Sequence, residues 1–135
     1  MMKLLLLFGA GGVGTLLRYG VNHWTRELVK GSLAETVHVW TIAVNVTGCF
    51  LIGLLWPLLH DRIDIREEWR IAILVGLLGG FTTFSTFGFE LFGLLEKGHP
   101  VRAAVYALSS VGLGLGAVWL GWTLAVRLGA TPTGA

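Results

Sequence analysis

The chain has 135 residues, of which 54% are hydrophobic and 13% are charged, about half the charged share of an average soluble domain. This composition excludes intrinsic disorder and makes a soluble surface hard to build. A net charge of +2 without any run of lysine or arginine excludes nucleic acid as a partner. The length allows one domain, and the single cysteine, Cys49, forms no disulfide within the chain.

The hydrophobic residues fall into four blocks, residues 4–24, 38–59, 70–95 and 101–127. Each block is 21 to 27 residues long, which matches the ~20 apolar residues that cross a membrane as a helix. A soluble helical bundle would show a polar stripe along every helix, and these blocks have no continuous one. The sequence therefore predicts an all-α integral membrane protein with four transmembrane helices in one domain, residues 1–135, followed by a disordered tail, residues 128–135.

The first block is rich in glycine and holds one formal charge, Arg18. Gly9, Gly11 and Gly14 complete a G-x-G-x-x-G pattern, but this pattern indicates dinucleotide binding only inside a strand-turn-helix unit, and no later segment alternates that way. Close helix packing is the favoured interpretation. Arg18 either extends to the membrane interface or faces a water-filled vestibule. The N-terminus also resembles a secretory signal without its cleavage pattern, so we retain it as a helix.

The second block holds no charge except for His38 at its edge. Thr41, Asn45 and Gly48 share one helical face, which makes a narrow polar stripe. Asn45 either joins two helices or donates hydrogen bonds to a pore. Trp40 stands near the end of the block, where we expect its ring to lie at the headgroup region.

The third block contains the sequence GLLGGFTTFSTF over residues 76–87, near its centre. Two adjacent glycines followed by four hydroxyl residues make a poor continuous helix. We expect the helix to be broken near mid-membrane, which lipid tolerates only where the backbone is buried in protein or lines a cavity. A glycine kink is the alternative.

Two kinds of side chain follow on this block. Phe84 and Phe87 share a face, where ordinary packing would suffice, although the positive edge of an aromatic ring can also favour an anion. Glu90 lies one turn beyond Thr86. An intramembrane carboxylate there either couples transport to protons or is hydrogen-bonded at the edge of a vestibule.

The last block places Tyr106 and Ser110 four residues apart on one face, and Gly114 continues that face without a hydroxyl. Gly112 and Gly116, one turn apart, are expected to allow close helix packing. The sequence contains no Ser-His-Asp set and no metal-spaced cluster of histidine and cysteine, so we expect no enzyme.

Basic residues barely distinguish the two sides of the predicted membrane protein. One side carries five of them, Lys3, Arg62, Arg66, Arg70 and Arg127, and the other carries four, Arg26, Lys30, Lys97 and Arg102. Because a bias in basic residues sets orientation, its near absence predicts insertion both ways and an antiparallel homodimer. The alternative is that an unseen partner or the distribution of charge within loops selects one orientation.

Three segments together resemble the Fluc family of fluoride channels, also called CrcB-type proteins. They are GGVGTLLRY over residues 11–19, the residues Thr41, Asn45, Gly48, Phe50 and Gly53, and the sequence GLLGGFTTFSTF. The resemblance covers residues 4–127. It implies an antiparallel dual-topology homodimer in the bacterial inner membrane, with two pathways for passive fluoride export and a structural sodium ion at its centre.

The resemblance also implies roles for particular residues. The fluoride pore would be lined by Phe84, Phe87, Asn45, Tyr106 and Ser110. Vestibule residues would be Thr41, Ser85, Thr86 and Arg18, to which our own interpretation adds Glu90. The carbonyl groups of Gly79 and Thr82 would hold the sodium ion. Gly114 departs from the family, since another hydroxyl is expected there.

Two further function classes remain open. A small multidrug-type proton-coupled antiporter also has four helices in a dual-topology dimer, but its chemistry expects a carboxylate in the first helix, and none precedes Glu27. A membrane scaffold held together by glycine packing would leave the polar residues at 82–87 without a role.

Overall fold

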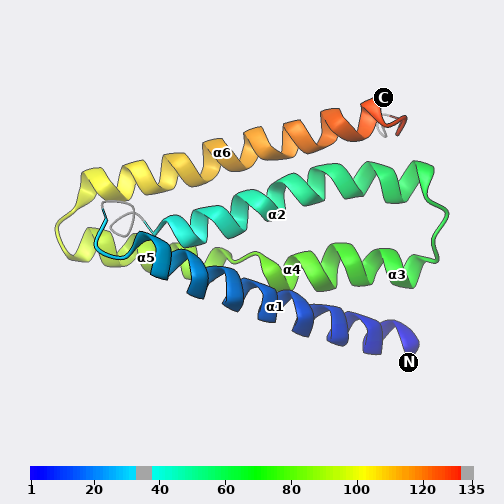
Figure 1. The fold of residues 1–135 in the computed structure, drawn as a ribbon, viewed down its shortest axis with the longest axis horizontal. Coiled ribbons are helices and arrows are strands. Elements are labelled where there is room, and N and C mark those ends of the chain that lie inside the picture. Colours follow the sequence, from blue (N-terminus) through cyan, green and yellow to red (C-terminus); the bar gives the residue numbers. More distant parts are fainter. Residues whose placement is uncertain (33–37, 132–135) are drawn as a thin grey trace.

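The computed structural model describes residues 1–32 and 38–131, and this part of the chain folds into helices (Figure 1). The elements in chain order are α1 (Met2–Val29), α2 (Val39–Pro57), the π-helix η2 (Leu58–Arg62), α3 (Glu67–Ile71), the π-helix η3 (Ala72–Leu77), α4 (Leu78–Phe81), α5 (Phe84–Glu96) and α6 (Pro100–Arg127). The prediction of an all-helical protein is confirmed. The disorder expected for the tail, residues 128–135, concerns mainly residues 132–135, which lie outside the described residues.

Four helical stretches are long and apolar enough to cross a membrane, as predicted: Met2–Val29, Val39–His60, Glu67–Glu96 and Pro100–Arg127. The start of α1, the end of α6 and the connection between η2 and α3 lie at one end of the molecule (Figure 1). The turn between α5 and α6 lies at the opposite end. Gly98 makes this turn with a φ of +74°, and Pro100 opens α6, where its missing N–H costs no hydrogen bond.

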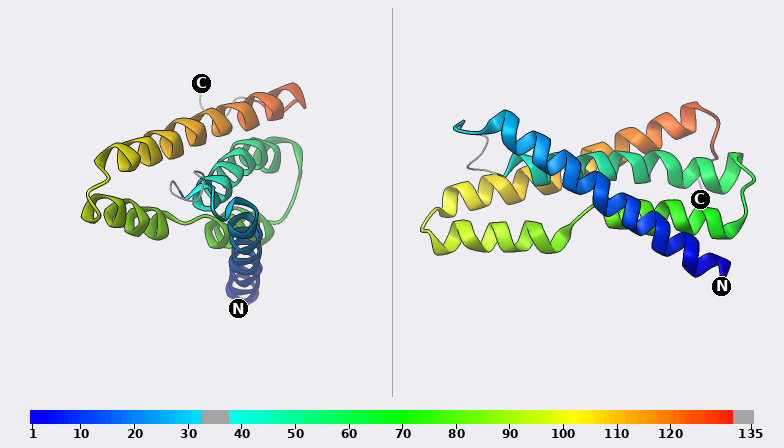
Figure 2. Two further views of the ribbon diagram at one scale, coloured as in Figure 1. Left: turned by 60° about the vertical axis from the view of Figure 1, so that its left-hand side comes forward. Right: turned by 60° about the horizontal axis from the view of Figure 1, so that its bottom comes forward.

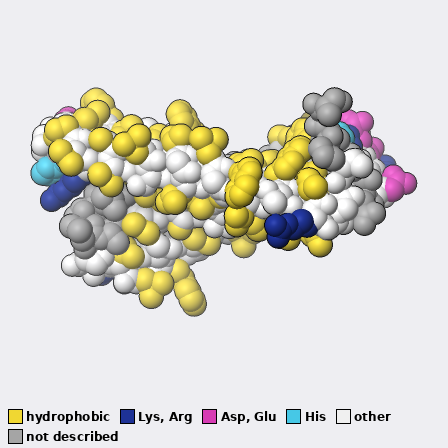
Figure 3. Space-filling view, turned by 90° about the horizontal axis from the view of Figure 1, so that it is seen from above, with side chains coloured by type: hydrophobic (Ala, Val, Ile, Leu, Met, Phe, Trp, Pro, Cys, Tyr) yellow, Lys and Arg dark blue, Asp and Glu magenta, His cyan; other side chains and the backbone are white. Residues whose placement is uncertain are grey.

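Large hydrophobic side chains cover the outside of the molecule. Figure 3 shows them spread along its length, with the acidic side chains toward the ends. Hydrophobic residues more than half exposed occur on α1, on the third long helix and on α6, among them Leu4, Phe8, Val75, Leu108 and Trp119. Such a surface has no favourable contact with water, whereas the hydrocarbon of a bilayer suits it.

Glycines bring the helices close together at two places. α1 crosses η3 and α4 (Figure 2), where a Cβ on Gly14 or Gly80 would collide with backbone of the other helix. α2 and α6 share the most extensive contact, and a Cβ on Gly53 or Gly121 would likewise strike facing backbone. The expectation for the glycines of the first block is thus met at Gly14. This is the small-residue packing that membrane helices use in place of a hydrophobic drive.

The expectation for Gly112 and Gly116 is not met within this chain. A Cβ added at either position would meet no atom of another helix within 4 Å among the described residues. Gly121, five residues beyond Gly116, makes the close contact with α2 instead. The reason is orientation, because Gly112 and Gly116 are exposed, whereas Gly114 and Gly121 are buried on the face of α6 that packs on α2.

Replacing Gly121 by alanine is therefore expected to lower the free energy of unfolding by about 1–3 kcal/mol, because the added methyl group forces α2 and α6 apart. The measurement is the melting temperature of the purified protein in detergent. Gly116→Ala on the same helix is the matched control and is expected to melt like the unchanged protein. Equal melting temperatures for the two variants would contradict this account of α2–α6 packing.

Candidate functional site

The third long helix is interrupted by two extended residues. α4 ends at Phe81, Thr82 has φ −82° and ψ 160°, Thr83 has φ −150° and ψ 116°, and α5 begins at Phe84. The neighbouring glycines, Gly79 and Gly80, remain helical within α4. Backbone groups in such a segment lose their helical partners and need others if they are away from water.

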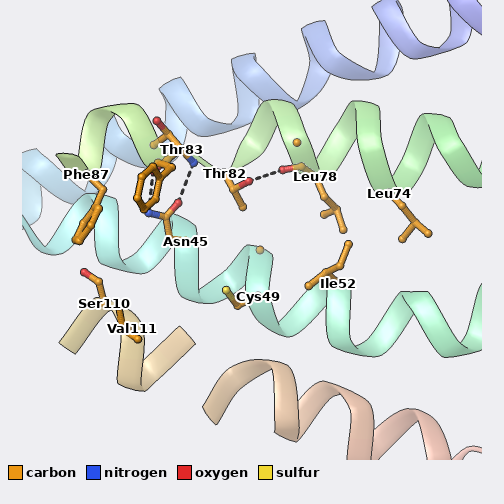
Figure 4. Close-up of a pocket in the computed structure, with 13 residues that line it drawn as sticks. Asn45, Cys49, Ile52, Leu74, Leu78, Thr82, Thr83, Phe87, Ser110 and Val111 are labelled. Atoms are coloured by element: carbon orange, nitrogen blue, oxygen red, sulfur yellow. Dashed lines mark hydrogen bonds between the residues drawn. The ribbon is translucent and has the colours of Figure 1, made fainter. Parts of the chain in front are cut away.

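Asn45 on α2 supplies these partners. Its Oδ1 accepts a hydrogen bond from the Thr83 N–H at 2.9 Å, and its Nδ2 donates to the Thr83 carbonyl oxygen at 3.0 Å (Figure 4). One primary amide thereby satisfies both backbone groups of one extended residue. A second N–H of the Asn45 amide remains for another acceptor.

Threonine side chains complete the interruption. The Thr83 hydroxyl accepts from the Thr86 N–H at 3.2 Å, which caps the start of α5, and donates to the Thr86 hydroxyl at 2.9 Å. The Thr82 hydroxyl donates back to the Leu78 carbonyl oxygen at 2.9 Å. Thr83 was not among the predicted site residues. Its signal was a threonine at the position where a helix cap is preferred, directly before the second helical segment.

The interruption takes the helical donors away from the carbonyl groups at the end of α4, among them those of Gly79 and Thr82. In a continuous helix the Thr83 N–H would bind the Gly79 carbonyl and the Thr86 N–H would bind the Thr82 carbonyl. The first donor binds Asn45 instead, and the second binds the Thr83 hydroxyl. The carbonyl oxygens of Gly79 and Thr82 are therefore left for another ligand.

A groove of about 390 Å³ lies beside the interruption (Figure 4). Six of the predicted site residues line it together: Asn45, Gly79, Thr82, Phe84, Phe87 and Ser110. They come from α2, α4, α5 and α6 and from the extended segment. The tertiary structure thus gathers residues that are up to 65 positions apart in the sequence.

Aromatic rings continue from this groove toward α6. The Phe84 side chain is 82% exposed, and its ring centroid lies 5.6 Å from that of Phe87. Phe87 is buried, and its ring centroid lies 5.1 Å from that of Tyr106, which is completely buried. Neighbouring rings in this row are tilted against each other, so they touch with ring edges as well as ring faces.

Glu90 ends this row of side chains. Its Oε2 accepts from the Tyr106 hydroxyl at 2.7 Å, and its Oε1 accepts from the Trp40 indole N–H at 2.9 Å. Glu90 thus accepts hydrogen bonds from side chains of two other helices. Trp40 is buried with its N–H directed at Glu90, and its place at the headgroup region stays a prediction.

The remaining predicted residues are placed as follows. The Thr41 and Ser110 hydroxyls are buried and have no hydrogen-bond partner among the described residues. Thr86 and Glu90 line a second cavity, whereas exposed Ser85 and half-buried Arg18 line neither cavity. At Gly114, where a hydroxyl was expected, an added Cβ would lie 3.4 Å from the Cys49 Sγ.

Asn45→Ala is expected to lower the free energy of unfolding by about 1–3 kcal/mol for each of the two Thr83 backbone groups that it leaves without a partner. Thermal unfolding in detergent measures this. Asn22→Ala is the matched control, because the Asn22 Oδ1 is buried without any hydrogen-bond partner among the described residues and its removal leaves no backbone group unsatisfied. A loss no larger for Asn45→Ala than for Asn22→Ala would show that the amide does not hold the interruption.

Comparison with known proteins gives one consistent result. Residues 5–122 match the family described as CrcB-like protein, Camphor Resistance (CrcB). The chain is 41% identical over 122 residues to a fluoride-specific ion channel FluC of Rhizobium leguminosarum, which covers 90% of this chain and 94% of the relative. It is 41% identical over 127 residues to a protein of the same name from Acidobacterium capsulatum, covering 94% and 98%. It is 42% identical over 125 residues to another from Pseudomonas fluorescens, covering 92% and 98%.

These relatives are named as ion channels, which agrees with the prediction of a transport protein and not an enzyme. They come from bacteria, and the four apolar helices of this chain are those of a multi-pass membrane protein. A family match over most of the chain, with relatives above 40% identity over nearly its full length, leads to one conclusion: the chain belongs to the CrcB-like family of bacterial membrane proteins.

Proposed function

We propose that this chain forms a fluoride-selective channel that passively exports fluoride from the bacterial cytoplasm, as an antiparallel dual-topology homodimer with a structural sodium ion at its centre. The observation that carries the proposal is the interruption at Thr82–Thr83, which assembles Asn45, Phe84 and Phe87 around one groove. We place this interruption near mid-membrane. The names of the relatives support fluoride as the permeant ion.

The groove offers donors suited to a small, strongly hydrated anion. A selective pathway must replace the water around fluoride with several weak donors, because one very tight site would prevent release. The unpartnered Ser110 hydroxyl and the second Asn45 N–H, both from residues that line the groove, are donors of this kind. A buried polar group without a partner is rare enough in folded proteins to require an explanation, and a permeant anion provides one.

The aromatic rings supply a second kind of contact. The edge of a phenylalanine ring carries partial positive charge, so edges directed at the pathway attract fluoride without a full countercharge. The ring planes of Phe84 and Phe87 are tilted at 42° to each other, and both residues line the groove, so a ring edge can face the pathway. Tyr106 and Ser110 continue the pathway along α6.

A second copy of the chain accounts for the open side of this groove. Phe84 is 82% exposed, and the half-buried polar side chains of Asn45 and Thr82 would meet lipid if nothing covered them. Lipid offers no hydrogen bonds to such groups, so burial against protein is favoured. The near equality of basic residues on the two sides of the chain allows the second copy to insert in the opposite orientation.

The carbonyl groups of Gly79 and Thr82 fit the proposed sodium ion. Hard cations prefer oxygen ligands, and these two oxygens have lost the helical N–H donors that would compete for them. The same two groups from an antiparallel partner would double the number of ligands. The ion would supply positive potential beside the pathways when bound.

Purified protein in liposomes loaded with fluoride tests the proposed function. We expect fluoride efflux, measured with a fluoride electrode, and no comparable efflux of chloride. Phe84→Ile and Phe87→Ile are each expected to reduce fluoride efflux at least tenfold while the protein still assembles as a dimer, because isoleucine removes the positive ring edge.

Phe92→Ile is the matched control for these variants, since Phe92 is also exposed on α5 but lines neither cavity. Its efflux is expected to equal that of the unchanged protein. Equal chloride efflux or obligatory proton movement would refute the channel proposal. Full efflux in both phenylalanine variants would refute only the role of the ring edges.

Removal of sodium tests the metal site. The melting temperature is expected to be higher in sodium chloride than in N-methylglucamine chloride of equal ionic strength. A concentration 100 times the dissociation constant adds about 2.7 kcal/mol by mass action. Thr83→Val removes the hydroxyl that caps the Thr86 N–H, so it is expected to loosen the interruption and to reduce this difference. Identical melting in both salts for the unchanged protein would argue against a structural sodium ion.

A further inference from the structure

A second cavity lies at the end of α1, the start of α2 and the side of α5, and it shares no lining residue with the groove. Its volume is about 440 Å³, and its lining residues are Arg26, Glu27, Lys30, His38, Trp40, Thr86, Phe89 and Glu90. Most of these side chains are ionisable or polar. The cavity therefore differs from the largely apolar surface around it.

Among the described residues, the charge of this cavity depends on one imidazole. The cations Arg26 and Lys30 and the carboxylates Glu27 and Glu90 cancel one another. Protonation of His38 would leave a net charge of +1 on the cavity wall. Because clefts concentrate the field of the charges that line them, one additional charge changes the occupancy of a small anion.

His38 is held in an unusual position. Its φ of 50° and ψ of 48° are left-handed, which is uncommon for a residue other than glycine and is retained where the surroundings determine it. The imidazole meets the Trp40 ring edge-on, with centroids 5.0 Å apart. Its Nδ1 lies 3.5 Å from Glu90 Oε1 and has no hydrogen-bond partner among the described residues.

Charged groups from several elements face this imidazole. Burial lowers the pKa of His38 below the ordinary 6.5, Glu90 on α5 acts in the opposite direction, and Arg26 on α1 and Lys97 after α5 lower it further. Tyr106 on α6 is the remaining titratable neighbour, with its ring centroid 5.6 Å away. The balance leaves His38 neutral at neutral pH, and it gains a proton only under acidic conditions.

We propose that this cavity is a binding site for a small monovalent anion, here fluoride, and that protonation of His38 increases its affinity. The inference rests on the proposed function in one respect. Fluoride bound here would supply the proposed pathway, whose residue Tyr106 is hydrogen-bonded to Glu90 in the cavity wall. Neutral His38 leaves no net charge to attract the anion. Protonated His38 forms an ion pair with Glu90 Oε1, and because Glu27 offsets Lys30, the charge of Arg26 is left in excess.

Linkage provides a test that does not depend on conduction. If protonation of His38 favours anion binding, fluoride must raise the pKa of His38 by the same factor. One charge acting across a water-filled cavity changes affinity by about threefold, equivalent to about half a pH unit. The His38 ring resonance is titrated by NMR in detergent micelles, in sodium fluoride and in sodium gluconate of equal ionic strength.

His60 is the internal control in this titration, because it stacks on Trp56 at the other end of α2 and does not line the cavity. Its titration curve is expected to coincide in the two salts. A His38 curve that also coincides in the two salts would overturn the inference. An upward shift of about half a unit confined to His38 supports it.

Fluoride efflux from liposomes at pH 7.5 and pH 5 gives the second test, with protein-free vesicles to measure leak at each pH. The unchanged protein is expected to gain about threefold at the lower pH, by the same one-charge argument. His38→Asn should show no gain, and asparagine tolerates the left-handed backbone. Equal gains in the two proteins would overturn the inference and leave the proposed function intact. No fluoride efflux at either pH would refute the proposed function, and the NMR titration would then decide the inference alone.

Discussion

The amide of Asn45 replaces two main-chain hydrogen bonds at the place where the third long helix is interrupted. Without a partner for both the N–H and the carbonyl of Thr83, an extended residue inside an apolar protein would cost several kcal/mol. The same contact takes the Thr83 N–H away from the Gly79 carbonyl. The interruption and the free Gly79 carbonyl therefore depend on one side chain from a different helix, whereas the Thr83 hydroxyl takes the helical donor of the Thr82 carbonyl.

Close contact between helices makes this interaction possible. Gly14 and Gly80 let α1 lie directly on α4, and Gly53 and Gly121 let α2 lie directly on α6. Because hydrocarbon is as apolar as the side chains, membrane helices associate through such packing and through hydrogen bonds between helices. The short distances place Asn45, Tyr106 and Glu90 where polar groups of neighbouring helices meet. The glycines thus allow close helix packing, and this packing also brings the polar side chains within hydrogen-bond distance of one another.

Local sequence predicted much of this arrangement, but not its details. Block length and hydropathy predicted four membrane-length helices, and the mixture of glycine, threonine and phenylalanine pointed to the groove residues. The adjacent glycines drew attention to residues 79–80, whereas the extended residues are Thr82 and Thr83. Glycine permits many conformations without requiring one, and the position was decided by the hydrogen bonds that Asn45 offers.

The sequence by itself determined that the protein is helical, that its surface suits lipid and that its polar residues are few and grouped. These properties follow from composition and spacing along one chain. Only the tertiary structure decided that Trp40 and Tyr106 hold Glu90 from two other helices, and that His38 lies beside the same carboxylate. The partners of Glu90 are 50 and 16 residues away in the chain. Hydropathy reports the surroundings of a residue only along the chain, whereas the chemistry of a buried carboxylate depends on groups brought to it in space.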